Sequence, residues 1–162
     1  NSITGYEATS LPRVSTTLAK QLALYVTIHS PLQMASDFIE NYEEHPEAFE
    51  FIKGVPVNWD TTIVLNGEIE QFLTIARKGK NSDNWYIGGI TNEESRTLQF
   101  DLSFLDEGSY IARIYADGDS ADWESNPLDY KIIEKVVFKG ELVTMKLASG
   151  GGQAIALEKL KD

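Results

Sequence analysis

The sequence predicts a mainly β protein, in which an antiparallel β-sandwich follows two helices and one short strand. Two observations carry this prediction. Apolar residues recur at helical spacing before Trp59, whereas after Trp59 they alternate with polar residues along short runs. Segments rich in Gly, Asn, Asp and Ser separate these runs at the short intervals typical of all-β sandwiches. We therefore divide the chain near Trp59, into residues 1–56 and residues 57–162.

The first helix is predicted over residues 15–29, STTLAKQLALYVTIH. Ser15 or Thr16 can cap its N-terminus, and Pro31 cannot continue it. Its apolar residues fall on one broad face: Val14, Leu18, Leu22, Leu24, Tyr25, Val26 and Ile28. So wide a stripe predicts burial on more than one side. We expect the helix to need neighbours from outside the chain and to drive self-association through this apolar surface.

A short strand and a second helix are predicted next. Residues 30–35, SPLQMA, form an extended apolar segment that is consistent with a buried strand. The helix is predicted over residues 46–54, because Pro46 suits a first helical position and Gly54 with Pro56 ends the pattern. Helix, strand and helix in this order are one and a half units of an α/β repeat, which is an unusual start for a β protein.

Eight strands are predicted after Trp59. In RTLQFDLS, for example, Leu98, Phe100 and Leu102 share one face while polar residues take the other, as a half-buried strand requires. A long loop, ADGDSADWESNP, and a glycine turn, SGGG, are among the separators. The predicted strands are 61–65, 71–77, 84–90, 96–102, 109–116, 130–138, 142–147 and 153–157.

Charge and composition exclude several classes of partner. The chain has 14 Lys and Arg against 25 Asp and Glu, a formal net charge of −11. We therefore expect neither nucleic acid nor an anionic membrane surface as a partner. The absence of cysteine excludes disulfides and thiolate metal sites. The polar start NSITG predicts no signal peptide, and without an initiator Met we expect a piece of a longer protein.

Three local motifs have a functional and a structural interpretation, and the structural one is preferred for each. DGDSAD, at residues 117–122, lacks the Gly and Glu that an EF-hand has at its sixth and twelfth positions, so a solvated hairpin loop is expected. SGGGQ lacks the Lys-Ser/Thr of a phosphate loop, so a glycine turn before the last strand is expected. His29 and His45 have no partner at metal-ligand spacing.

Tryptophan offers a candidate for glycan contact, because aromatic faces suit the C–H faces of sugar rings. Trp85 lies in an alternating strand and is expected in the core. Trp123 lies in a polar loop, so it is the candidate for glycan stacking.

Several long segments resemble one family. They are TTLAKQLALYVTIHSPLQMASDFIENY, EFIKGVPVNWDTTIVLNGE, FLTIARKGKNSDNWYIGGITNEESRTLQFDLSFLDEGSYIARIYADG and ASGGGQAIAL. In this order they are similar to the C-terminal end of glycoside hydrolase family 97, the α-glucosidases and α-galactosidases typical of Bacteroides-like bacteria. The resemblance covers roughly residues 14–158.

The resemblance implies a fold and a parent enzyme. In that family a (β/α)8 barrel precedes a small C-terminal sandwich, so residues 1–56 would be the tail of the barrel and SPLQM its eighth strand. The parent would be a periplasmic, calcium-dependent, exo-acting hydrolase of α-linked oligosaccharides. Its expected partners are the remainder of the catalytic barrel, the oligosaccharide substrate and further copies in a homo-oligomer.

The same resemblance assigns no catalytic or calcium-binding residue to this chain. The family's catalytic carboxylates and calcium-holding glutamates belong to earlier strands of the barrel. Ser30, Gln33 and Asp37, near the end of the one barrel strand in this chain, would at most line the substrate pocket. We therefore expect the chain alone to be inactive. Glucoside or galactoside preference, and inverting or retaining chemistry, are both left open.

Three interpretations therefore compete. The first is the C-terminal fragment of an α-glycosidase, whose sandwich packs on the barrel and serves oligomerisation. The second is a non-catalytic sandwich that binds carbohydrate, and the third is a scaffold or interaction domain.

Overall fold

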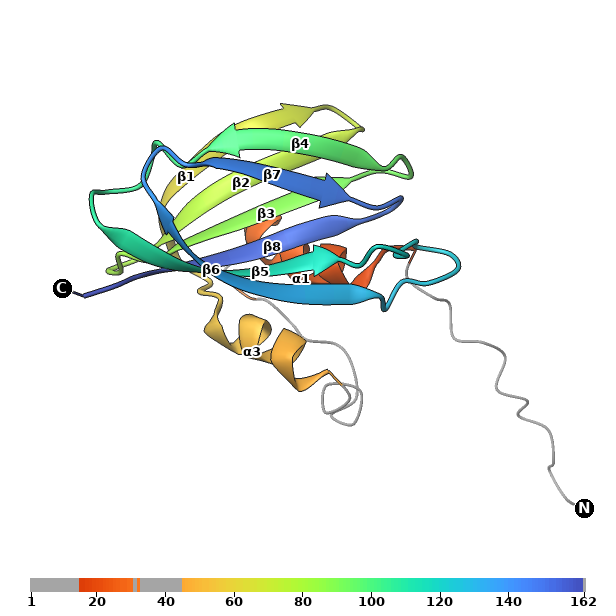
Figure 1. Ribbon diagram of the computed structural model, residues 1–162, viewed down its shortest axis with the longest axis horizontal. Helices are drawn as coiled ribbons and strands as arrows, with labels where there is room; N and C mark the ends of the chain where they lie inside the picture. Colours follow the sequence, from red (N-terminus) through yellow and green to blue (C-terminus); the bar gives the residue numbers. More distant parts are fainter. Residues whose placement is uncertain (1–14, 31, 33–44, 162) are drawn as a thin grey trace, which may run out of the picture.

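The computed structural model describes residues 15–30, 32 and 45–161, which form three layers (Figure 1). A six-stranded antiparallel sheet in the order β1-β2-β3-β8-β5-β6 is the middle layer. A two-stranded sheet, β4-β7, lies on one face, and two helices lie on the other. The elements are α1 (Leu18–Thr27), α3 (Pro46–Gly54), β1 (Trp59–Glu68), β2 (Phe72–Gly79), β3 (Trp85–Thr91), β4 (Arg96–Asp101), β5 (Ser109–Asp117), β6 (Tyr130–Phe138), β7 (Leu142–Leu147) and β8 (Gly152–Lys159).

The mainly β sandwich preceded by helices is confirmed, and all eight strands predicted after Trp59 are present, two of them (130–138 and 142–147) with the predicted bounds and six with shifted ends. The short strand predicted over residues 30–35 lies mostly outside the described residues and stays a prediction. The largest shift is in β1, predicted over 61–65 and observed over Trp59–Glu68. Its pairing with β2 is interrupted between Trp59 and Thr61 and again between Val64 and Asn66. Each irregularity changes which residues face the core, so simple alternation does not extend through it.

Helix α1 is shorter than predicted and is capped by a different residue. It begins at Leu18, and its N-cap is Thr17, whose side chain accepts a hydrogen bond from the Lys20 backbone N–H at 3.2 Å. Thr16 instead accepts a hydrogen bond from the Gln21 side chain. The prediction of Ser15 or Thr16 as the cap was wrong, because three adjacent hydroxyl residues offer the same capping chemistry and only backbone geometry selects among them.

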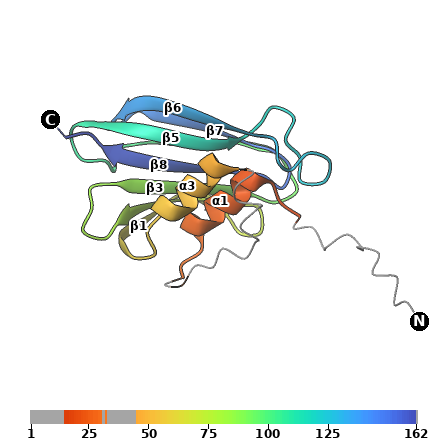
Figure 2. The same cartoon turned by 90° about the horizontal axis from the view of Figure 1, so that it is seen from below.

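The apolar face of α1 is buried within this chain, against β3 and β8 (Figure 2). Leu22 is 1% exposed and Val26 is fully buried, so the expectation that these residues need neighbours from outside the chain was wrong. Glycines explain how the helix reaches the sheet. A Cβ on Gly88 would lie 2.7 Å from the carbonyl oxygen of Ala23, and one on Gly152 would lie 2.6 Å from the Lys20 Cα.

Two apolar clusters result, one on each face of the six-stranded sheet. The cluster between the sheets contains Trp85, as predicted, together with Ile87, Tyr110 and Met145. The cluster under the helices contains Phe51 of α3, whose ring lies edge-on to Tyr115 at 5.1 Å between centroids. Helix α3 begins at Pro46 and ends at Gly54, as predicted. The six-stranded sheet is therefore packed on both faces, although Val136 and Phe138 at its β6 edge stay exposed.

Candidate functional site

A buried arginine holds the end of α1, next to the segment predicted to line a substrate pocket. Arg77 of β2 is 4% exposed, and its guanidinium donates to the Thr27 carbonyl at 3.3 Å. A second guanidinium nitrogen lies 3.1 Å from His29 Nδ1. Because arginine can only donate, Nδ1 must accept, and the ring proton of neutral His29 is assigned to Nε2. Burial lowers the pKa of Arg77, and within the described residues no carboxylate forms an ion pair with it.

The structure describes one of the three predicted pocket residues. Ser30 is half-buried, and its hydroxyl donates to the Leu32 carbonyl oxygen. Gln33 and Asp37 lie outside the described residues. Their role in lining a substrate pocket stays a prediction.

The loop between β5 and β6 begins with a buried carboxylate. Asp117 Oδ2 accepts from the backbone N–H groups of Ala148 at 2.8 Å and Gly152 at 2.9 Å, which ties β5 to the glycine turn before β8. Burial raises the pKa of Asp117, against the opposing effect of hydrogen bonds from Thr17, Ala148 and Gly152 and of the Lys20 charge. The predicted glycine turn is confirmed, since Gly150 has a φ of +61° and β8 begins at Gly152.

Asp122 and Asp129 bind the backbone of this loop, whereas Asp119 pairs with Lys131. Asp122 Oδ1 accepts from the N–H groups of Glu124 at 3.0 Å and Ser125 at 2.9 Å. No three His, Cys, Asp or Glu side chains within the described residues converge on a common point as metal ligands would. The predicted hairpin connection is confirmed, since β5 and β6 pair antiparallel on either side of this loop.

Trp123 is half-buried and packs against the glycine turn. A Cβ on Gly150 would lie 2.6 Å from the Trp123 Cβ, so the absence of a side chain there makes room for the tryptophan. Trp123 lines a hollow of about 280 Å³ together with Lys20 and Asn92. Its proposed stacking on glycans stays a prediction.

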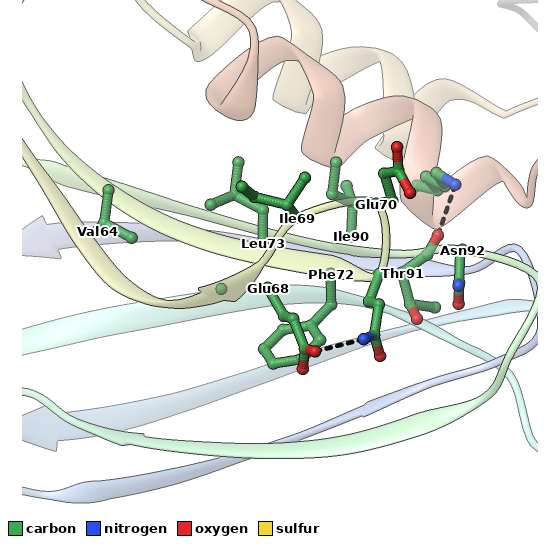
Figure 3. A pocket seen from close by; sticks show the side chains of 12 residues that line it. Val64, Glu68, Ile69, Glu70, Phe72, Leu73, Ile90, Thr91 and Asn92 are labelled. Atoms are coloured by element: carbon green, nitrogen blue, oxygen red, sulfur yellow. Dashed lines mark hydrogen bonds between the residues drawn. The ribbon is translucent and has the colours of Figure 1, made fainter.

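An apolar groove of about 600 Å³ lies beside α1, over the β1–β2 hairpin (Figure 3). Figure 3 shows Val64, Ile69, Leu73 and Ile90 on the side of the sheet where α1 lies. Ile69, in the turn, is 91% exposed. In the same view Glu70 lies on the side of α1, whereas Glu68 points to the opposite side of the hairpin and accepts a hydrogen bond from the Gln71 side chain at 2.5 Å. We call this surface, lined by Lys20, Val64, residues 67–73 and residues 90–92, the hairpin groove.

A second apolar surface lies on the outer strand of the large sheet. Val136 is 50% exposed and Phe138 is 56% exposed. In register, Ile111 lies opposite Val136, and the Arg113–Glu134 ion pair follows at 2.9 Å. We call these five residues the β6 face.

Sequence reasoning missed the β6 face, although a signal was present. The strand YKIIEKVVF carries apolar residues at both even and odd positions. A strand with one solvated face would be apolar at alternate positions alone. Apolar residues on both faces therefore indicate a second contact surface. No comparable local signal identifies Arg77, whose partners lie about fifty residues away in sequence.

Comparison with known proteins places these surfaces in context. Residues 58–158 match the family model described as Glycosyl-hydrolase 97 C-terminal, oligomerisation. A retaining α-galactosidase of Bacteroides thetaiotaomicron is 37% identical over 153 residues, which cover 94% of this chain and 22% of that enzyme. A probable retaining α-galactosidase of Streptomyces bingchenggensis is 27% identical over 84% of this chain and 20% of its own length.

Solved structures agree with the sequence comparison. A glycoside hydrolase family 97 enzyme from Pseudoalteromonas sp. strain K8, solved in complex with acarbose, has a TM-score of 0.90 and 44% identity. The match covers 92% of this chain and 23% of that enzyme, so the chain spans about a fifth to a quarter of the relatives it matches. A β-arabinopyranosidase, at 23% identity and a TM-score of 0.71, shares the fold. On the strength of the match over residues 58–158, the chain belongs to the C-terminal domain family of glycoside hydrolase family 97.

Proposed function

We propose that this chain is the C-terminal part of an exo-acting α-glycosidase that hydrolyses α-glucosides or α-galactosides. The family match over residues 58–158 carries this proposal, because that family is described by its position in the enzyme and by oligomerisation. The curated relatives are named as retaining α-galactosidases, whereas the Pseudoalteromonas enzyme was solved with acarbose and with panose. Both substrate classes therefore stay in the proposal, and the relatives' names favour a retaining mechanism.

The β6 face is our proposed contact with a second copy of the chain. It has an apolar centre, Val136 and Phe138, flanked by Arg113 and Glu134. A two-fold contact brings the same patch together from both copies, so a patch that carries both signs of charge can be complementary to itself. Aromatic and arginine side chains also contribute most of the binding energy in many interfaces.

The hairpin groove is our proposed contact with the catalytic part of the same polypeptide. Glu68 and Glu70 are both among its lining residues, so two copies of the groove would bring like charges together. It also continues the surface that α1 already covers, beside β2 and β3. An apolar element with a basic flank, from the remainder of the enzyme, fits this chemistry.

The test separates the two surfaces by variants that introduce a charge into one apolar surface at a time. In sedimentation equilibrium, Val136→Lys with Phe138→Lys should weaken self-association of the chain at least tenfold, because two charges are buried in an apolar contact. The matched control Ile69→Lys should leave self-association unchanged. The groove assignment predicts that Ile69→Lys lowers the melting temperature of the full-length enzyme but not that of the isolated chain. Dissociation by Ile69→Lys together with no effect at β6 would contradict both assignments.

Catalysis, calcium and location are proposed for the parent enzyme. No three His, Cys, Asp or Glu side chains among the described residues come together as metal ligands would. A calcium ion held by the remainder of the enzyme is our proposal from the family resemblance. No described helix is long and apolar enough to cross a membrane. A periplasmic location is our proposal from the family resemblance.

A further inference from the structure

A third concave surface lies on the face of the six-stranded sheet opposite the helices. In Figure 1, β4 and β7 lie over the β2–β3 part of the large sheet, and β5 and β6 extend beyond them. The resulting cleft has a volume of about 750 Å³, within the range of small-molecule sites. We call it the sandwich cleft. It belongs to neither the hairpin groove nor the β6 face.

A buried amide lies at the inner end of the sandwich cleft. Gln153 of β8 is 4% exposed and lines the cleft. Its neighbours in the strand assign its direction, since Ala154 belongs to the cluster under the helices and Ile155 to the cluster between the sheets. Among the residues that the structure describes, none forms a hydrogen bond with the Gln153 side chain. The amide is not among the fully buried polar atoms that lack a partner, so the small exposed area of Gln153 includes its amide, which opens on the cleft where a ligand or water can bond it.

The mouth and floor of the cleft differ in chemistry. Asp119 and Lys131 form an ion pair of 2.7 Å at the mouth. Lys146 also lines the cleft and has no ion-pair partner within the described part of the chain. Ile114 and Ile133 supply apolar surface, and Ile133 is exposed. A ligand here meets an amide, a carboxylate and an ammonium around an apolar floor.

These groups select a ligand class. An anionic ligand such as a phosphate would approach Asp119 in a chain with a net charge of −11. An entirely apolar ligand would leave the Gln153 amide unpaired. Sugar hydroxyls both donate and accept, as an amide does, and the C–H faces of sugar rings can pack on isoleucine.

We propose that the sandwich cleft binds a neutral sugar unit of a glycan, with Gln153 bonding its hydroxyls at the inner end. Asp119 and Lys146 contact outer hydroxyls, and Ile133 packs against the ring. The site differs from Trp123, which lines another hollow. It would hold glycan independently of catalysis and of oligomerisation.

The experiment titrates the chain with maltotriose and, separately, melibiose while recording its ¹H–¹⁵N spectrum. Both backbone and side-chain amide signals are followed, and the Gln153 amide is assigned by its loss in Gln153→Leu. At tens of millimolar, at least one sugar should shift the Gln153 amide and residues of β5 and β6. Gln153→Leu should weaken that binding at least tenfold, because it removes hydrogen bonds without changing side-chain volume greatly. Gln71→Leu is the control, since Gln71 lies in the β1–β2 turn, where it bonds Glu68, and lines the hairpin groove instead of the cleft.

A second pair of variants covers the case in which Gln153→Leu does not fold. Asp119→Asn, at an exposed position, should weaken binding severalfold, whereas Asp83→Asn, at another exposed position that also pairs with a lysine, should not. Binding that survives both Gln153→Leu and Asp119→Asn would overturn the proposal. So would binding abolished by Trp123→Ala alone, or no shift in the cleft with either sugar.

Discussion

The Gly88 Cα lies so close beneath Ala23 that a Cβ there would sit 2.7 Å from the Ala23 carbonyl oxygen. The same hypothetical Cβ would meet Val26 Cβ at 3.0 Å. On the opposite face, a Cβ on the neighbouring Gly89 would lie 2.1 Å from the Met145 sulfur. The two glycines of WYIGGIT thus allow close packing on both faces of the central strand, and the helix layer depends on the first of them.

Gly88→Ala should therefore destabilise the chain. The added methyl group meets helix backbone, which cannot rotate away as a flexible side chain could, so we expect a loss of about 1–3 kcal/mol in the free energy of unfolding. Urea denaturation followed by tryptophan fluorescence measures it. Gly54→Ala is the matched control, since nothing lies within 4 Å of a Cβ at Gly54. Equal stability of the two variants would show that α1 can shift without cost.

Arg77→Met should loosen the end of α1. The substitution keeps most of the buried aliphatic stem but removes the hydrogen bonds to the Thr27 carbonyl and His29 Nδ1, at an expected cost of about 1–3 kcal/mol. Hydrogen exchange should also become faster at the last turn of α1. Arg113→Met, which breaks the exposed pair with Glu134, should cost no more than about 1 kcal/mol. A larger effect at Arg113 than at Arg77 would contradict this assignment.

The pH dependence of stability should show Asp117 with a sign opposite to that of the exposed acids. Burial raises the pKa of Asp117 in the folded chain, so the folded state binds a proton more readily than the unfolded state, in which the pKa is about 3.9. Its contribution to stability is therefore fully present below about pH 3.9 and is lost as the pH rises through the higher folded pKa. Relative to Asp117→Asn, the unmodified chain should gain stability as the pH falls through this window.

Asp122 provides the control for this experiment. Hydrogen bonds from Ser125 and Glu124 lower the pKa of Asp122, so its contribution is present above the unfolded pKa and is lost as the pH falls through the folded pKa. Relative to Asp122→Asn, the unmodified chain should lose stability on acidification. Thermal unfolding of the three chains between about pH 3 and 7 tests both signs. The same sign for both residues would refute the burial argument for Asp117.

The chain alone should hydrolyse neither an aryl α-glucoside nor an aryl α-galactoside, with or without calcium. Glycoside hydrolysis requires two carboxyl groups at a fixed separation on either side of the bond. The acids of the β5–β6 loop instead bind backbone N–H groups or a lysine. Release of the aryl group by the purified chain measures the rate, with the full-length enzyme as the positive control. Turnover that disappears in Asp37→Ala would place an active site in this chain and contradict the assignment.

Local patterns were enough to identify the class of fold and the type of each helix and strand that the structure describes. The alternation in RTLQFDLS identifies β4, and the proline and glycine signals identify both ends of α3. The order of the motifs identifies the family, because it depends on residue identity and not on packing.

Local patterns do not show which elements cover each face of the six-stranded sheet. Leu22 and Val26 looked like an exposed contact surface in sequence, but Gly88 and Gly152 let β3 and β8 bury them. Arg77, Asp117 and Gln153 acquire their surroundings from strands and loops far away in the chain. Periodicity depends on neighbours a few residues apart, whereas burial, pKa and cleft shape depend on long-range pairing, which brings together residues that no local pattern connects.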